Sequence, residues 1–105
     1  MKNYQDIEAK ELSEKYAKVK DDFVWVDVRT DEEYDEGHIP GSIHIPHDQM
    51  EKRYHELTPY QGKKLMLICR SGRRSVLACN VLAEKGFSEL YNMKGGMLEW
   101  TGPIE

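Results

Sequence analysis

Two short apolar runs constrain the fold of this chain more than any other feature. Phe23–Val28 is rich in β-branched and aromatic residues, and Leu65–Ile68 is apolar without interruption. Runs of this length and composition are typical of strands that are covered on both faces of a sheet. Sheets of that kind are flanked by helices, so helices are expected between the strands.

Helical patterns do lie between the predicted strands. Thr30 as N-cap with Glu33 three residues later forms a capping box, which predicts a helix that ends near residue 37. A helix of about two turns is expected from Met50 to the Thr58-Pro59 pair. Further helices are predicted near 9–18 and 75–85, and further strands near 4–7, 43–46 and 89–93. This alternation predicts an α/β fold for residues 1–105, as one domain with a mainly parallel sheet and helices on both faces.

The charge and the cysteine content exclude several classes of function. The formal net charge is −4, whereas a nucleic-acid partner normally requires a basic face. The N-terminus has no apolar signal core, and no window is long and apolar enough to span a membrane. Cys69 and Cys79 would lie almost three helical turns apart, too far to pair. We therefore expect a cytoplasmic protein that contacts neither nucleic acid nor a membrane.

The chain carries no recognisable cofactor or metal motif. It contains neither a phosphate-binding P-loop nor a dinucleotide-binding glycine pattern. Its four histidines do not have a metal-binding spacing: His38, His44, His47 and His55. We therefore expect no cofactor and no metal.

The segment with the most chemical information follows the second apolar run. Cys69 ends that run, and the next residues are Arg70-Ser71-Gly72-Arg73-Arg74-Ser75, at the start of a predicted helix. Arginines and a helix N-terminus favour a thiolate, the reactive form of cysteine. Backbone amides and guanidinium groups in the same loop would hold an anionic substrate beside the sulfur. We therefore predict Cys69 as a nucleophile and the loop 70–75 as its substrate site.

Other residues near the predicted site have two interpretations. Asp27 and Arg29 also lie at the carboxyl end of a strand, where ligands bind in parallel sheets. They either support the cysteine loop or form an ordinary ion pair with Glu33 or another acid. Cys79 is interpreted as a packing residue of its helix, and Arg73 as a solvated or structural charge.

Four segments occur in an order that is typical of one protein family. They are Asp27-Val28-Arg29 with Glu33-Tyr34, Gly37-His38-Ile39-Pro40-Gly41-Ser42-Ile43 with Ile45-Pro46, the cysteine loop 69–75, and Gly95-Gly96 with Trp100. Together they resemble the rhodanese family of sulfurtransferases. The resemblance implies a small α/β domain with a parallel sheet, usually of five strands. It also implies that Cys69 accepts a sulfur as a persulfide, and that Arg70 contacts the substrate.

The length of the cysteine loop bears on which chemistry it serves. Four residues separate Cys69 from Arg74, and Ser75 occupies the position that cysteine-dependent phosphatases give to arginine. The shorter loop therefore favours sulfur transfer over phosphatase or arsenate reductase chemistry. The expected partners are a small anionic donor such as thiosulfate and an acceptor thiol or sulfur-acceptor protein. A carrier or regulatory module with little turnover of its own is the alternative, and the sequence does not predict an oligomeric state.

Overall fold

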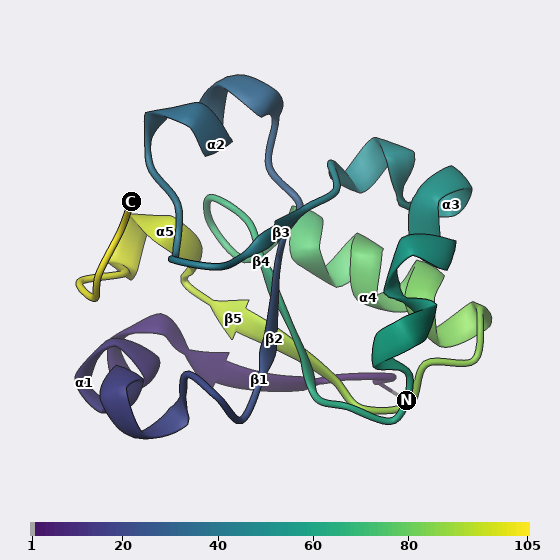
Figure 1. Ribbon diagram of the computed structural model, residues 1–105, viewed down its shortest axis with the longest axis horizontal. Helices are drawn as coiled ribbons and strands as arrows, with labels where there is room; N and C mark the ends of the chain where they lie inside the picture. Colours follow the sequence, from purple (N-terminus) through teal and green to yellow (C-terminus); the bar gives the residue numbers. More distant parts are fainter. Residues whose placement is uncertain (1) are drawn as a thin grey trace.

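In the computed structural model, which describes residues 2–105, five parallel strands form one sheet (Figure 1). The strand order is β1-β5-β4-β2-β3, which confirms the predicted α/β class and the parallel sheet. The strands are β1 (Gln5–Glu8), β2 (Val24–Asp27), β3 (Ile43–His44), β4 (Leu65–Ile68) and β5 (Leu90–Lys94). The helices are α1 (Ala9–Val19), α2 (Asp31–Glu36), α3 (Met50–Arg53), α4 (Arg74–Glu84) and α5 (Gly96–Glu99). None of these helices is both long and apolar enough to cross a membrane.

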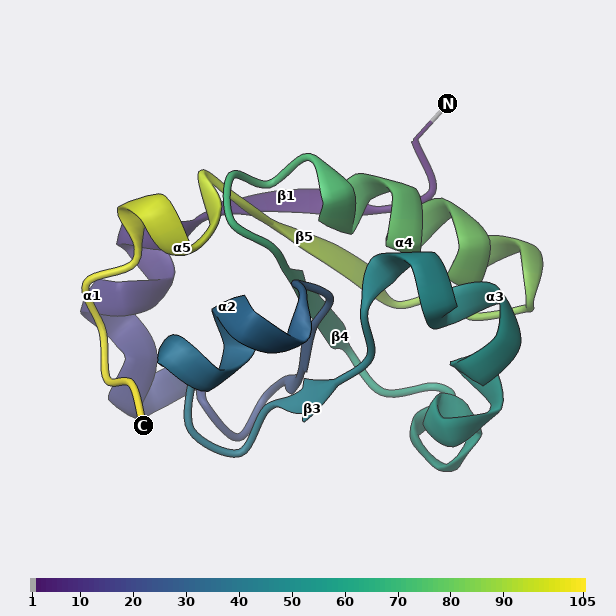
Figure 2. The ribbon, with the colours of Figure 1, turned by 90° about the horizontal axis from the view of Figure 1, so that it is seen from above.

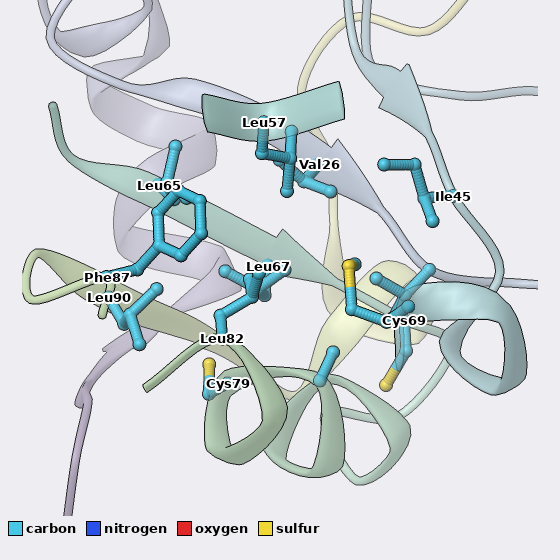
Figure 3. Packing of buried hydrophobic residues seen from close by; sticks show 13 residues of the cluster. Val26, Ile45, Leu57, Leu65, Leu67, Cys69, Cys79, Leu82, Phe87 and Leu90 are labelled. Carbon is cyan, nitrogen blue, oxygen red and sulfur yellow. The ribbon is translucent and has the colours of Figure 1, made fainter. Parts of the chain in front are cut away.

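The sheet separates two hydrophobic clusters, as the uninterrupted apolar runs predict. Along β4, Leu65 and Leu67 belong to one cluster, whereas Met66 and Ile68 belong to the other. All four side chains are fully buried, because successive residues of a strand point to opposite faces. Helix α4 covers the first face, as Figure 3 shows, and α1 covers the second. Figure 2 shows α1 and α5 on one side of the molecule and α3 and α4 on the other.

The pairing of β2 with β4 brings the candidate site residues to one edge of the sheet. Asp27 lies opposite Ile68, and the amide of Val28 donates to the carbonyl of Ile68 at 2.8 Å. The next residue along β4 is Cys69, so the carboxyl ends of the two central strands meet at the cysteine. The predicted capping box also forms, with Thr30 and Glu33 bonded reciprocally at the start of α2.

One predicted element differs from the structure. The helix expected from Met50 to Thr58-Pro59 is one α-helical turn, Met50–Arg53, followed by a 3₁₀ helix, Tyr54–Tyr60, that contains Pro59. The prediction that Pro59 ends the helix was therefore wrong. Burial of Leu57 holds this segment against the core, and the Thr58 hydroxyl donates to the His55 carbonyl at 2.8 Å. A second 3₁₀ turn, His47–Gln49, precedes α3.

Candidate active site

The Cys69 side chain is buried at the end of β4 inside a tight loop. The backbone amide of Gly72 donates to its Sγ at 3.0 Å, and the Ser75 Oγ lies 3.4 Å from the same sulfur. The loop can curl back in this way because Gly72 has a φ of +92°, which side-chain-bearing residues rarely adopt. A Cβ at this position would also lie 3.0 Å from the backbone nitrogen of Gly95. The sequence predicted several inward amides, and within residues 2–105 the Gly72 amide is the one bonded to the sulfur.

Helix α5 is packed directly against the cysteine loop. The amides of Met97 and Leu98 donate to the carbonyls of Cys69 and Arg70 at 2.9 and 3.0 Å. The approach is so close that a Cβ on Gly96 would lie 2.4 Å from the Arg70 carbonyl oxygen. The glycine pair at the start of α5, Gly95 and Gly96, therefore allows this turn to pack against the backbone of the cysteine loop.

Asp27 and Arg29 pair with each other rather than with Glu33. The Arg29 Nε and Nη2 donate to the Asp27 carboxylate at 2.7 to 3.0 Å, and Nη2 also donates to the Gly37 carbonyl at 2.8 Å. Both side chains are buried, with exposed fractions of 8% for Arg29 and 0% for Asp27. This pair joins the end of β2 to the turn after α2, next to the strand that carries Cys69.

The three arginines of the loop have different surroundings. Arg74 contacts both carboxylate oxygens of Glu33 on α2, at 2.9 and 3.0 Å. The hydrogen bond from Arg74 lowers the pKa of Glu33 to about 2, and Glu33 in turn raises the pKa of Arg74. Arg70 and Arg73 are exposed and have no ion-pair partner within the described part of the chain. Arg74 thus ties the loop to α2, while Arg70 and Arg73 remain available to an anion.

A hollow of about 320 Å³ lies beside the loop, between α2 and α5. Charged and apolar side chains share its lining. It is lined by Arg29, Glu33, Glu36, Gly37, Arg70, Met97, Leu98 and Ile104. Arg70 is the loop arginine on this lining, whereas Arg73 is not part of it.

Two candidate residues of the site were not predicted from the sequence. Asn92 of β5 is buried, and its Oδ1 accepts a short hydrogen bond from the Ser75 hydroxyl. Its Nδ2 donates to the Gly72 carbonyl at 3.2 Å and to Asp6 Oδ1 at 2.9 Å. The one signal that the sequence offered was a polar Asn92 between the hydrophobic residues Tyr91 and Met93 of β5. Nothing in the sequence indicated that Asp6, 86 positions away, is its partner.

Cys79 lies on the buried face of α4, as predicted for a packing residue (Figure 3). Burial raises the pKa of its thiol to about 12, so it remains protonated at neutral pH. Both cysteines are free thiols. Within residues 2–105, no group of three His, Cys, Asp or Glu side chains is arranged to hold a metal ion.

Known proteins resemble this chain along most of its length. The putative sulfurtransferase YtwF of Bacillus subtilis is 38% identical over 100 residues, which are 91% of this chain and 94% of that protein. The putative sulfur carrier protein YrkF of the same organism is 44% identical over 80 residues, but the match covers only 42% of its length. A crystal structure of a rhodanese-related protein from Thermoplasma volcanium superimposes with a TM-score of 0.82 and 28% identity, covering 97% of this chain and 98% of that one.

The family comparison agrees with the geometry of the site. The model of the rhodanese-like domain matches residues 8–103, which include strands β2 to β5, the cysteine loop and the α5 turn. Since this match extends over nearly the whole chain, the protein belongs to the rhodanese-like domain family.

Proposed function

We propose that the protein is a sulfurtransferase that carries a sulfane sulfur on Cys69. The observation that supports this most directly is the placement of the Cys69 sulfur within the loop of the six following residues, 70–75, with the Gly72 amide 3.0 Å away. An amide donor stabilises a thiolate and also a sulfur anion bonded to it. The family and the relatives named as sulfurtransferases support the same chemistry.

The proposed reaction has two steps. The Cys69 thiolate attacks the outer sulfur of thiosulfate, a new S–S bond forms, and sulfite leaves with the electron pair of the broken S–S bond. An acceptor such as cyanide or a thiolate then attacks the terminal sulfur of the persulfide, and the Cys69 thiolate is restored. No external oxidant or reductant is needed, because each leaving group keeps the electron pair of the broken bond and the transferred sulfur stays at the sulfane oxidation level.

Arg70 is the proposed contact for the anionic donor. It has no ion-pair partner within residues 2–105 and lines the hollow beside the loop. Its guanidinium would meet the sulfonate end of thiosulfate with charge-assisted hydrogen bonds. Arg73 is exposed on the same loop, and Arg74 acts chiefly through Glu33. Asp27 and Arg29 are proposed as supports of the strand end beside Cys69.

Thiocyanate formation from thiosulfate and cyanide tests this proposal. The wild-type protein should turn over, and Cys69→Ser should abolish the activity because a hydroxyl does not form the persulfide. Cys79→Ser is the matched control and should retain activity, since that thiol packs in the core. Full activity of Cys69→Ser would contradict the assignment of the nucleophile.

A carrier role is the second candidate, and one observation favours it. The Cys69 side chain has an exposed fraction of 0%, so the sulfur atom that would carry the persulfide is protected from bulk solvent. A relative that matches over 80 residues is itself named as a putative sulfur carrier. Mass spectrometry after exposure to thiosulfate separates the two roles. A persulfide on Cys69 with negligible thiocyanate formation would indicate a carrier.

A further inference from the structure

The Ser75 hydroxyl lies between two groups that could each accept a hydrogen bond from it. The Cys69 sulfur is 3.4 Å from Ser75 Oγ, and Asn92 Oδ1 is at short hydrogen-bond distance from the same oxygen. A serine hydroxyl has one proton and two lone pairs, so it can donate to only one of these groups at a time. The direction of this hydroxyl therefore determines whether Ser75 favours the thiol or the thiolate of Cys69.

The surroundings of Asn92 fix which way its amide points. Its Nδ2 faces Asp6 Oδ1 at 2.9 Å and the Gly72 carbonyl at 3.2 Å, and both of these oxygens can only accept. Asp6 remains a carboxylate at neutral pH, because a hydrogen bond from Lys2 at 2.7 Å lowers its pKa. The Nδ2 group must therefore stay on this side, and Oδ1 must face Ser75.

We propose that Asn92, oriented by Asp6, is a positioning residue that accepts the hydrogen bond of the Ser75 hydroxyl and so turns the Ser75 lone pairs toward the Cys69 sulfur. The inference rests on the proposed function, in which Cys69 is the nucleophile. In this arrangement the thiol of Cys69 donates to Ser75, whereas the Gly72 amide is the donor that favours the thiolate. Ser75 thereby restrains ionisation of the resting cysteine, and the Asn92 amide maintains that restraint.

Other charged or titratable groups lie near the cysteine loop, and the test must hold them constant. They are Arg74 of α4 with Glu33 of α2, the Asp27–Arg29 pair at the end of β2, the exposed Arg70 and Arg73, and the Cys79 thiol. None of them contacts Asn92 or the Ser75 hydroxyl through a hydrogen bond within residues 2–105. Substitutions at Ser75 and Asn92 therefore leave these charges in place.

The test measures one substitution, Ser75→Ala, in two backgrounds. The readout is the thiolate-to-thiol ratio of Cys69 at fixed neutral pH, from ultraviolet thiolate absorbance after subtraction of the matching Cys69→Ser protein. In the wild type, Ser75→Ala should raise the ratio about twofold, because the weakly donating thiol loses its acceptor. With Asn92→Leu the hydroxyl is free to donate to the sulfur, and Ser75→Ala should then lower the ratio about tenfold.

The reversal of sign separates positioning from a merely structural role. Any loosening of the loop by Asn92→Leu affects both proteins of that background equally and cancels from the comparison. An effect of the same sign in both backgrounds would overturn the proposal. If Asn92→Leu does not fold, the test rests on Ser75→Ala in the wild-type background. An unchanged or lower thiolate-to-thiol ratio of Cys69 would then overturn the proposal.

Failure of this proposal is distinguishable from failure of the proposed function. The thiolate ratio requires no sulfur transfer, and thiocyanate formation by the wild type is measured separately. Asp6→Asn is a further check, since its amide oxygen can still accept from Asn92, whereas Asp6→Ala removes the acceptor. Asp6→Asn should keep the wild-type response to Ser75→Ala, and Asp6→Ala should weaken it. The same response in both Asp6 variants would remove Asp6 from the proposal.

Discussion

The floor and the rim of the site differ in how their polar groups are used. The floor consists of Asp27, Arg29, Ser75 and Asn92, which are buried and hydrogen-bonded. The rim consists of Arg70 and Arg73, which are exposed and without an ion-pair partner in the described part of the chain. Buried charges are costly unless paired, whereas exposed charges contribute little to stability. The floor should therefore determine stability, and the rim should determine ligand binding.

The largest effect is expected from breaking the ion pair of the floor. Asp27→Ala leaves the Arg29 guanidinium buried without its partner, because the side chain is only 8% exposed. We expect a loss of about 3–5 kcal/mol in the free energy of unfolding, measured by denaturant titration. A protein that does not fold would agree with the upper end of this range.

The control for this prediction removes both charges. Replacing Asp27 and Arg29 together with Leu should cost less than Asp27→Ala alone, since no unpaired charge remains in the core. An equal or larger loss in the double variant would show that packing, rather than charge, gives the floor its stability.

The next largest effect concerns the contact between α5 and the cysteine loop. Gly96→Ala would bring a Cβ to 2.4 Å from the Arg70 carbonyl oxygen, and the φ of Gly96 is +61°. Neither backbone can yield without moving the loop, so we expect stability and thiocyanate formation to fall together. Gly41→Ala is the matched control, because Gly41 has a φ of +75° but nothing within 4 Å of its would-be Cβ. The control should cost about 1–2 kcal/mol, and Gly96→Ala clearly more; equal losses would contradict the close approach.

The separation of contacting residues along the chain explains which features the sequence could predict. The strands, the capping box and the cysteine loop depend on neighbouring residues, and the structure has each of them near its predicted place. The bonds that organise the site are of another kind. Arg74 and Glu33 are 41 positions apart, and Asn92 and Asp6 are 86 apart. Such pairs follow from the strand order, which places β1 beside β5 and β2 beside β4, and no local pattern encodes them.

The 3₁₀ segment and the partner of Arg29 are two further features that the local sequence did not predict. A proline signals the end of an α-helix through its missing amide, but the tighter 3₁₀ helix tolerates Pro59. Sequence spacing also left the partner of Arg29 open between Glu33 and another acid. Arg29 pairs with the neighbouring Asp27 because that carboxylate is buried and has no other cation within hydrogen-bond reach among the described residues.

A substitution on the rim should separate binding from stability. Arg70→Ala removes an exposed side chain, so the free energy of unfolding should change by less than about 0.5 kcal/mol. The KM for thiosulfate should rise about tenfold, because one charge-assisted contact is lost, while kcat changes less. Arg73→Ala is the control and should have the smaller effect on KM, since Arg73 is not on the lining of the hollow. A large loss of stability in Arg70→Ala would contradict the prediction that rim residues affect ligand binding and not stability.

The smallest effect comes from the pair that joins the loop to α2. Arg74 lowers the pKa of Glu33 from its ordinary value of 4.5 to about 2. The depressed pKa means that the pair stabilises the folded protein fully above about pH 4.5, and that this contribution is lost as the pH falls toward about 2. Both side chains are about a quarter exposed, at 27% and 25%, so solvent screening reduces the contribution to about 1 kcal/mol.

Glu33→Gln isolates this contribution from other acidic groups. The variant should be less stable than the wild type at neutral pH, and the difference should shrink between about pH 4.5 and pH 2 in denaturant titrations. Glu32→Gln is the matched control, because Glu32 is exposed on the same helix and forms no ion pair within residues 2–105. A pH-independent difference would mean that the Glu33 side chain acts through the capping hydrogen bond that it accepts from the Thr30 amide and not through Arg74. In that case the loop would be positioned by α5 and the floor alone, and Arg74 would belong with the rim.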